Sequence, residues 1–583
     1  MAAFIEQNGV VIVSPVFCIA LVNRDALEKN SDLIAPSSSW HRFTRSWPPA
    51  VLGVAAGFWL IGFLLQIWRF ESFGSTYDQA LFLQELWSTA QGRPFESSLS
   101  SVLSSAVAVN GNLPSVDYLH LGQHANALTL LLAPAVAAFG WVALPFAQAT
   151  ALTAAGLVLW RIAQPRLPKD LAWRLVLSFF LSGAVFGPML ENFHDLIWYP
   201  LLGFLILGGM LERRWHRVVL SSIALLLVRE DSGLLLFSIG LWATVRRPDL
   251  RGIGFGLMVI SSVWVFVVTG LIQPSVDASL ADRFLQEKFG HLVADVSGGT
   301  LSVSFQMLQK PVAVLEALVS PPGATFGFLI ALSLPLLLVP LLSVDAALMV
   351  SVPLLIALLS QGRTALAVTL RYVLALVPGL YIGTLLWWQS HLSIWKKRWL
   401  RPCWTAALSL GLLLTIVSNP HRTFSAVVPD SFSPWVHVSP WEMLGRRDIG
   451  MKALSLIPPK ASVSGDTPML PRLAQREVAI RFPHGVHYLD REGQVQDVDW
   501  IAAFPGYYSP LVPLFKRETE QQESILNAVE RLTASGRYEP VFCEGGAVIL
   551  RRVSGTVQDQ NSSVDKSNSC LLPDAANRSG FSF

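Results

Sequence analysis

Long apolar runs alternate with short charged loops over roughly the first 420 residues. Eight of these runs approach the about 20 residues that a helix needs to cross a bilayer. They cover residues 49–68, 173–190, 196–211, 252–273, 324–342, 345–360, 366–388 and 402–418. Two further apolar regions, 124–162 and 218–245, divide less clearly, and a re-entrant or interfacial helix would account for each. The pattern predicts a mostly α-helical, polytopic membrane bundle over 49–419, with about 9–12 spanning or re-entrant helices.

The pattern changes beyond Pro420, where apolar stretches become short and are separated by Pro, Gly and charged residues. We expect strands within 461–466, 477–481, 498–502 and 547–551, and a helix at about 518–534. These elements predict a small α/β domain over 420–553. Residues 1–48 contain no basic segment ahead of their weak apolar run, which predicts a poorly ordered cytoplasmic lead and no cleaved signal peptide. Residues 554–583, rich in Ser, Asn and Asp, predict a disordered tail.

Short basic clusters orient the bundle, because positive charge is retained on the cytoplasmic side during insertion. The clusters are Arg42 and Arg45; Arg161, Arg166, Lys169 and Arg174; Arg213, Arg214 and Arg217; Arg246, Arg247 and Arg251; and Lys396, Lys397, Arg398 and Arg401. With all of them inside, the loop 71–123, the turn 191–195, the segment 274–320 and everything after 419 lie outside. We therefore expect a multi-pass cell-membrane protein with a cytoplasmic N-terminus and an external C-terminal domain.

Composition supports this class and excludes others. Of 583 residues, 52% are hydrophobic and 14% are charged, against roughly 25% charged in soluble domains. The net charge of +3, from 43 basic and 40 acidic residues, gives no support for a nucleic-acid partner. The four cysteines lie far apart, which argues against a zinc site or a disulfide scaffold. The sequence motifs of ATP-driven transporters, hydrolases and dinucleotide-binding proteins do not occur.

The first external loop carries two carboxylates on one predicted helix, at about 75–87. Asp78 and Glu85 are seven residues apart, so both project from the same helix face. A carboxylate at the membrane surface can act as a general base on a hydroxyl group or as a metal ligand. The alternative for Asp78 is structural, because Ser75 followed three residues later by an acid is a capping-box pattern.

The same loop ends with His120 and His124, which have the i, i+4 spacing that offers two imidazoles to one ion or phosphate. The alternative is a pair of interfacial anchors, because no third ligand is fixed by spacing.

Three further charged groups lie at the ends of apolar runs or inside them, where ionisable residues usually face a cavity or one another. His194 and Asp195 interrupt two apolar runs, although a polar interfacial turn explains them equally well. Arg229, Glu230 and Asp231 are three adjacent charges inside the run 218–245. Arg363 and Arg371 flank the external end of the run 366–388, and arginine binds phosphate oxygens bidentately.

Several of these residues belong to an ordered series of motifs: Tyr77-Asp78 with the following Ala-Leu-Phe-Leu-Gln-Glu-Leu-Trp, Gly92-Arg-Pro-Phe95, Leu121-Gly-Gln-His124, Phe193-His194-Asp195, Arg229-Glu230-Asp231, Pro468 to Arg476, Arg481-Phe-Pro483 and Asp497-Val-Asp-Trp500. The series resembles a bacterial family of predicted membrane proteins, the domain of unknown function twenty seventy-nine, over roughly residues 50–510. That family in turn looks like a member of the C-type glycosyltransferase superfamily of multi-pass enzymes, which use polyprenyl-phosphate sugars.

The resemblance implies a membrane glycosyltransferase in the bacterial inner membrane, with its C-terminal domain in the periplasm. Asp78 falls where the superfamily has its catalytic carboxylate, and Asp195 falls where a second external acid would lie. The expected partners are membrane lipid, a polyprenyl-phosphate sugar donor and a glycan, lipid or protein acceptor.

In this reading the substrate-binding residues are Glu85, His120, His124, His194, Arg229, Glu230, Asp231, Arg363 and Arg371. A divalent cation such as Mg or Mn would suit the carboxylates, but no spacing requires one. The competing interpretation is a transporter or a lipid- or polysaccharide-handling protein without bond chemistry, in which the intramembrane charges line a path. A structural or assembly protein is the third class.

Overall fold

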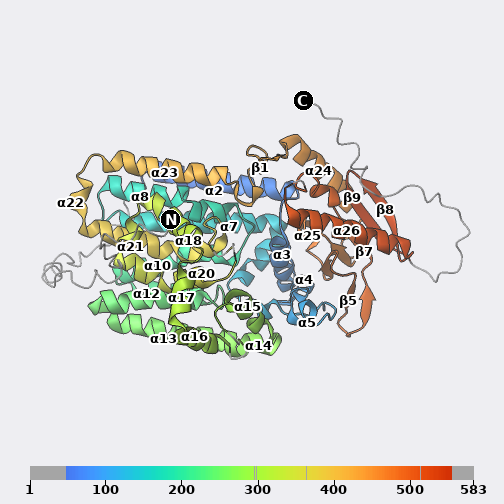
Figure 1. The fold of residues 1–583 in the computed structure, drawn as a ribbon, viewed down its shortest axis with the longest axis horizontal. Coiled ribbons are helices and arrows are strands. Elements are labelled where there is room, and N and C mark those ends of the chain that lie inside the picture. Colours follow the sequence, from blue (N-terminus) through green and yellow to red (C-terminus); the bar gives the residue numbers. More distant parts are fainter. Residues whose placement is uncertain are drawn as a thin grey trace, which may run out of the picture. The chain divides into compact units, whose positions relative to one another are not determined.

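A computed structural model describes residues 47–293, 296, 299–362, 364, 366–512 and 514–553 (Figure 1). The predicted tail 554–583 and nearly all of the predicted lead 1–48 lie outside the described residues, as does Arg363.

Among the described residues, five helical segments are long and apolar enough to cross a membrane. They are Pro49–Glu71 (α2), Thr129–Ala163 (η5, α6, η6 and α7), Lys169–Leu190 (α8 and α9), Pro248–Val276 (η8, α13, η9 and α14) and Leu400–Val417 (α23). A sixth results if Pro311–Leu318 (α17) and Pro322–Leu336 (α18 and η10), which are bent by 60°, form one span. The shorter apolar helices are Asp195–Leu211 (η7 and α10), Trp215–Leu226 (α11) and Ser232–Arg246 (α12). The predicted mostly helical membrane bundle is thus confirmed, with fewer full-length spans than apolar runs.

The number of full-length spans falls because several apolar runs are broken. The run 324–342 breaks at Leu337 and Leu338, whose φ values of 57° and 59° are left-handed, and the chain resumes as η11 (Val339–Leu341), α19 (Val344–Met349) and α20 (Ser351–Leu359). The run 366–388 begins with turns and η12 (Arg371–Ala375), and its helix α21 starts only at Val377. There the backbone N–H of Arg371 donates to a carboxylate oxygen of Glu191 at 2.9 Å. The polar contact replaces the helical turn that hydropathy alone predicts.

The described basic clusters gather at one end of the bundle. Arg401 pairs with Asp170 at 2.9 Å, which joins loops from opposite halves of the sequence, and Arg213 pairs with Asp249 at 3.2 Å. Arg166 lies close enough to Glu212 for electrostatic interaction. α11 starts at this end and α12 returns to it, so the run 218–245 turns back at Arg229–Asp231, as its charge pattern predicts.

The first external loop forms a short helical layer beside the bundle. It contains α3 (Tyr77–Ala90), α4 (Ser98–Ser101), α5 (Ser105–Ala108) and η4 (His120–Gly122). α3 packs against α6 (Ala133–Phe139) on one side and against α25 (Leu470–Leu473) of the C-terminal region on the other. Helix α14 (Gln273–Val276) contacts η4, and it leads into α15 (Leu280–Phe289) and α16 (Gly299–Gln309).

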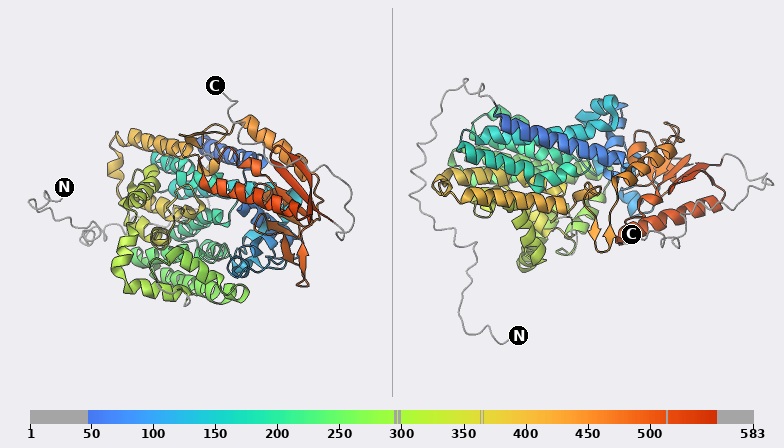
Figure 2. Two further views of the ribbon diagram at one scale, coloured as in Figure 1. Left: turned by 45° about the vertical axis from the view of Figure 1, so that its right-hand side comes forward. Right: turned by 90° about the horizontal axis from the view of Figure 1, so that it is seen from above.

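The C-terminal region contains a five-stranded mixed sheet in the order β4-β3-β7-β9-β8. Its strands are β3 (Val463–Gly465), β4 (Ala479–Arg481), β7 (Trp500–Ala503), β8 (Tyr538–Glu544) and β9 (Ala547–Arg552). β3 runs parallel to β4 and to β7, whereas β9 is antiparallel to β7 and β8. The helix α26 (Lys516–Ala534) lies along the sheet and buries Ile525, Ala528 and Val529 in the same core (Figure 2). Two short hairpins, β1–β2 (Ser431–Phe432, Trp435–Val436) and β5–β6 (His487–Leu489, Val495–Asp497), and helix α24 (Pro440–Leu454) complete the region.

Polar contacts attach this region to the end of α2 and to the first external loop. A Glu71 carboxylate oxygen accepts from Arg447 at 2.7 Å and pairs with Arg472 at 3.2 Å. Glu96 of the loop pairs with Arg491 at 2.7 Å. On α4, Ser98 donates to the carbonyl of Ala479 on β4 at 2.7 Å. Helix α3 is therefore packed between the membrane bundle and the C-terminal region. This packing restricts the positions of its side chains.

Candidate functional site

The first external loop meets the bundle at an arginine that is shared by two carboxylates. The Nη1 atom of Arg371 lies 3.1 Å from Oδ2 of Asp78 and also contacts Oε1 of Glu191. The Asp78 side chain is 35% exposed, whereas that of Glu191 is 5% exposed. Asp78 stands at the first turn of α3, and its N-cap residue, Thr76, makes no side-chain capping bond. Asp78 is therefore the accessible member of the triad.

The surroundings of Asp78 keep it ionised. Burial alone would raise the pKa of this carboxyl, but the positive charge of Arg371, with a further contribution from His194, holds the pKa below its ordinary value. A carboxylate in this state accepts hydrogen bonds strongly and carries a fixed negative charge at neutral pH.

Asp195 is fully buried, and it shares with Asp78 an electrostatic interaction with His194. One of its carboxylate oxygens contacts Nδ1 of His194, and the other has no hydrogen-bond partner among the described residues. The His194 ring packs edge-on against Phe82 of α3, with 5.3 Å between the ring centroids. Burial lowers the pKa of the His194 imidazole. The Asp195 carboxylate thus contacts His194 and, unlike that of Asp78, is not exposed to solvent.

Glu85, seven residues after Asp78, is the opposite kind of acid. It is 1% exposed, accepts one hydrogen bond from Asn126 at 2.8 Å, and leaves its other oxygen without a partner in the described structure. Burial raises the pKa of Glu85 to about 8, with a further contribution from the negative charge of Asp195. Glu85 is therefore protonated at neutral pH, although it shares a helix face with an ionised acid.

The two histidines of the loop occupy different environments. His120 is 3% exposed and bonds through Nδ1 to the hydroxyl of Ser100 at 2.8 Å, and burial lowers its pKa to about 3. His124 contacts Glu230 at 2.9 Å through its own Nδ1. The two rings are 5.7 Å apart between centroids and nearly perpendicular. Their Nδ1 atoms have different partners, Ser100 and Glu230, and Nε2 of His120 has no hydrogen-bond partner among the described residues.

The charges between α11 and α12 form one connected network. Arg229 donates to both oxygens of Asp231, at 3.1 and 2.9 Å, and lies 3.4 Å from Glu230. Tyr199 of α10 donates to Asp231 at 2.8 Å. Glu230 also accepts the backbone N–H of Ala125 at 3.1 Å. The network joins the external loop to the α11–α12 turn, and each of its charges has a partner.

The sequence-predicted residues that the structure describes are therefore linked in one group, which includes Asp78 and Glu85 of α3. The unpartnered buried atoms Glu85 Oε1, His120 Nε2, Asn126 Oδ1 and Asp195 Oδ2 belong to the same group. In the part of the chain that the structure describes, no three His, Cys, Asp or Glu side chains gather as metal ligands.

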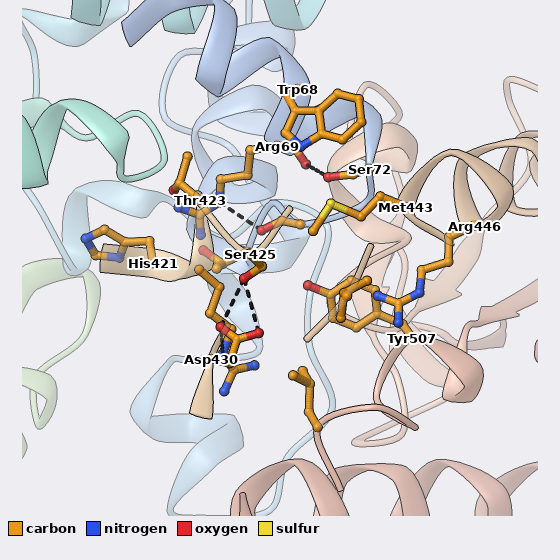
Figure 3. Close-up of a pocket in the computed structure, with 15 residues that line it drawn as sticks. Trp68, Arg69, Ser72, His421, Thr423, Ser425, Asp430, Met443, Arg446 and Tyr507 are labelled. Carbon is orange, nitrogen blue, oxygen red and sulfur yellow. Dashed lines mark hydrogen bonds and ion pairs between the residues drawn. The ribbon is translucent and has the colours of Figure 1, made fainter. Parts of the chain in front are cut away.

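A cavity of about 250 Å³ opens beside this cluster (Figure 3). Its wall includes Arg69 and Thr76 from the bundle side, and Arg422, Asp430 and Arg446 from the segment after α23. Thr76, two residues before Asp78, lines the cavity, whereas Asp78, Arg371 and Glu191 do not. Arg69 of the cavity wall interacts electrostatically with Glu191 and Asp78, which places the cavity near the triad.

Four residues of the site and its cavity are not among those predicted from the sequence: Glu191, Asn126, Tyr199 and Arg69. Glu191 and Arg69 each end an apolar run, and the rule that charges near spans are functional identifies both. Asn126 and Tyr199 give no such signal, because their roles depend on long-range contacts with Glu85 and Asp231.

Comparison with known proteins identifies a family and a distant likeness to a solved structure. The family described as "Predicted membrane protein (DUF2079)" matches residues 69–549. No curated protein matches the chain. The crystal structure of ArnT from Cupriavidus metallidurans bound to undecaprenyl phosphate is 11% identical, with a TM-score of 0.46 over 87% of this chain and 98% of that one.

Proposed function

The chain belongs to the DUF2079 family of predicted membrane proteins, and we propose that it transfers a sugar from a polyprenyl-phosphate donor to an acceptor on the outer face of the membrane. The observation that carries the proposal is the geometry of Asp78. It is a partly exposed carboxylate, it is ionised beside Arg371, and it lies two residues after Thr76, which lines a cavity. The motifs around it resemble the DUF2079 family, which in turn looks like a member of the C-type glycosyltransferase superfamily.

In the proposed reaction, an acceptor hydroxyl attacks the anomeric carbon of the sugar with inversion. A carbon–oxygen bond forms to the acceptor, and the bond from carbon to the donor phosphate oxygen breaks, so that polyprenyl phosphate leaves with the electron pair. The hydroxyl proton passes to Asp78. Because the pKa of Asp78 is held low, it orients the hydroxyl by a hydrogen bond and takes the proton late, as the attacking oxygen becomes acidic. Arg371 steadies the negative charges around this step.

The buried members of the cluster have positioning roles in this proposal. Asp195 orients His194, whose ring packs on Phe82 of the helix that carries Asp78. His124 and Glu230 tie the end of the external loop to the bundle. Glu85 and His120 lie too deep to meet a substrate in this conformation.

An extracytoplasmic site is supported by two features. The described basic clusters gather at the end of the bundle opposite the Asp78 cluster, and basic loops are typical of the cytoplasmic side. Cys543 of β8 is disulfide-bonded, which is typical of oxidising compartments.

Sugar transfer tests the proposal directly. Membranes containing the wild type, Asp78→Asn or Asp117→Asn, at equal protein levels, would be given radiolabelled polyprenyl-phosphate hexoses or pentoses. Asp117 is an exposed acid of the same loop and provides the matched control. We expect label in a lipid or polymer product with the wild type and Asp117→Asn, and a loss of about 100-fold or more with Asp78→Asn, the scale of general-base catalysis. Equal transfer by all three proteins would reject the role of Asp78, and no transfer from any donor by folded wild type would reject the function.

A further inference from the structure

The cavity near Asp78 contains a buried arginine that forms no close ion pair, although Glu191 and Asp78 act on its charge from a greater distance. Arg69, near the end of α2, is 6% exposed and donates to the backbone carbonyls of Gly74 at 2.9 Å and Leu190 at 3.0 Å. Among the described residues no carboxylate forms an ion pair with it. A buried charge is costly unless it is paired. The cavity wall is where an anion could supply the missing partner.

Two further arginines face the same space from the segment after α23. Arg446 of α24 is held by Glu442 at 2.8 Å and lies over the ring of Tyr507, and Arg422 is held by Glu518 at 3.1 Å. Neither Glu442 nor Glu518 lines the cavity. The carboxylates that hold the two guanidinium groups are therefore not part of the cavity wall, on which Arg69 and Arg446 are seen in Figure 3.

Asp430, the acidic residue of the cavity wall, already has hydrogen-bond partners. Asp430 accepts from Asn419 at 3.1 Å and from Ser425 at 3.0 Å, and Arg422 lies 3.9 Å away. Three arginines thus line the cavity against one carboxylate among its described walls. A guanidinium group matches phosphate oxygens in both charge and hydrogen-bond geometry.

The size of the cavity limits the ligand. At about 250 Å³ it lies below the roughly 300–1,000 Å³ of pockets that enclose drug-sized molecules. A phosphate or diphosphate group fits, whereas a sugar with its carrier does not. Arg371, in contrast, is already neutralised by Asp78 and Glu191, which leaves it poorly suited to hold the phosphate by itself.

We propose that the cavity bounded by Arg69, Arg422 and Arg446 binds a phosphate group next to Asp78. This inference rests on the proposed function, in which it is the site of the substrate's phosphate. Arg422 and Arg446 supply guanidinium N–H donors to the phosphate. Arg69, which is buried and forms no close ion pair, supplies a positive charge.

The surface next to the cavity favours a lipid as the source of the phosphate. Asp430 and Val438 line the cavity and flank the hairpin β1–β2, which exposes Phe432 and Trp435. The hairpin follows α23, whose exposed leucines face lipid if α23 spans the bilayer. Aromatic side chains gather at membrane interfaces, so a lipid phosphate could reach the cavity along this edge.

Binding experiments on the full chain in phosphatidylcholine nanodiscs test the site without any sugar. The probes are inorganic phosphate and a polyprenyl phosphate, and the proteins are the wild type, Arg446→Gln, Arg422→Gln and Arg531→Gln. Arg531 is an exposed residue of α26 that donates to the carbonyl of Asn527, and it controls for the loss of one charge. We expect about tenfold weaker binding for each cavity variant, the effect of one charge-assisted hydrogen bond, and unchanged binding for Arg531→Gln.

A second readout uses the wild type alone, in case a variant does not fold. Arginine modification by phenylglyoxal, mapped by peptide mass spectrometry, should be slowed by the probes at Arg422 and Arg446 but not at Arg531. Tighter binding of polyprenyl phosphate than of inorganic phosphate would identify a lipid source, and equal binding would identify a free phosphate group. Equal binding by all four proteins, or protection that spares both cavity arginines, would overturn the proposal. Because no sugar is present, these results are independent of whether transfer occurs.

Discussion

At the scale of single residues, two acids of one helix have opposite protonation states. Asp78 is partly exposed beside Arg371, whereas Glu85 is buried with Asn126 as its hydrogen-bond partner. Their spacing of seven residues predicts the shared helix face. In the structure, His194 acts electrostatically on Asp78, and the adjacent residue Asp195 acts electrostatically on Glu85. The sequence cannot predict the difference between them, because the position of Arg371, almost 300 residues away, decides it.

Glu85→Gln should make the stability of the protein less sensitive to pH. The folded-state pKa of Glu85 is about 8, above its ordinary value of 4.5, so the folded protein keeps a proton that the unfolded chain releases. The stabilisation is complete below about pH 4.5 and is lost as the pH rises towards about 8, by about 1 kcal/mol per pH unit. Thermal unfolding at pH 6 and pH 8.5 should therefore show a larger loss for the wild type than for Glu85→Gln.

The exposed acid Glu492 provides the control for this measurement, and Glu492→Gln should follow the wild type at both pH values. Parallel losses in the wild type and Glu85→Gln would show that Glu85 does not hold a proton in the folded state.

At the scale of elements, the apolar period predicts where helices form but not where they break. The expected runs 49–68 and 402–418 appear as α2 and α23 with small shifts at their ends. The expected helix at about 518–534 appears as α26, and four predicted strands appear as β3, β4, β7 and β9. The broken runs differ, because their breaks depend on tertiary contacts such as the bond from Arg371 to Glu191, which no local pattern encodes.

Close helix packing in the bundle depends on a glycine of α21. A Cβ atom at Gly383 would lie 2.4 Å from the backbone of Ala346 on α19. Gly383→Ala should therefore force α19 and α21 apart and destabilise the protein by about 1–3 kcal/mol, the usual cost of overpacking. Thermal unfolding in detergent measures this as a lowered midpoint.

Gly57→Ala on α2 is the matched comparison, since no described atom lies within 4 Å of a Cβ built there. It should be neutral, or stabilising by up to about 1 kcal/mol through helix propensity. A Gly383→Ala protein as stable as Gly57→Ala would show that α19 and α21 do not pack this closely.

At the scale of the whole molecule, the site depends on contacts between the bundle and the C-terminal region. Gln84 of α3 donates to Ser98 of α4 at 2.9 Å and to the carbonyl of Arg476 at 3.1 Å, so the helix that carries Asp78 is tied to the C-terminal region. The sequence predicts the two regions from composition but gives no sign of how they dock. The phosphate cavity could not be predicted for the same reason, because Arg69 and Arg446 are far apart in sequence.

The proposed orientation of the molecule in the membrane predicts which residues a reagent outside the cell can reach. Residues 213–217 belong to the basic end of the bundle, whereas Glu492 lies in the turn between β5 and β6, next to Arg491, which pairs with the external loop at Glu96. Charge retention on the cytoplasmic side predicts that these two places face opposite compartments. A membrane-impermeant maleimide should label Glu492→Cys in intact cells and Arg213→Cys only after the membrane is opened, with the unsubstituted chain as background. Labelling of Arg213→Cys alone in intact cells would invert the orientation and place Asp78 on the cytoplasmic side, where an acceptor outside the membrane could not reach it.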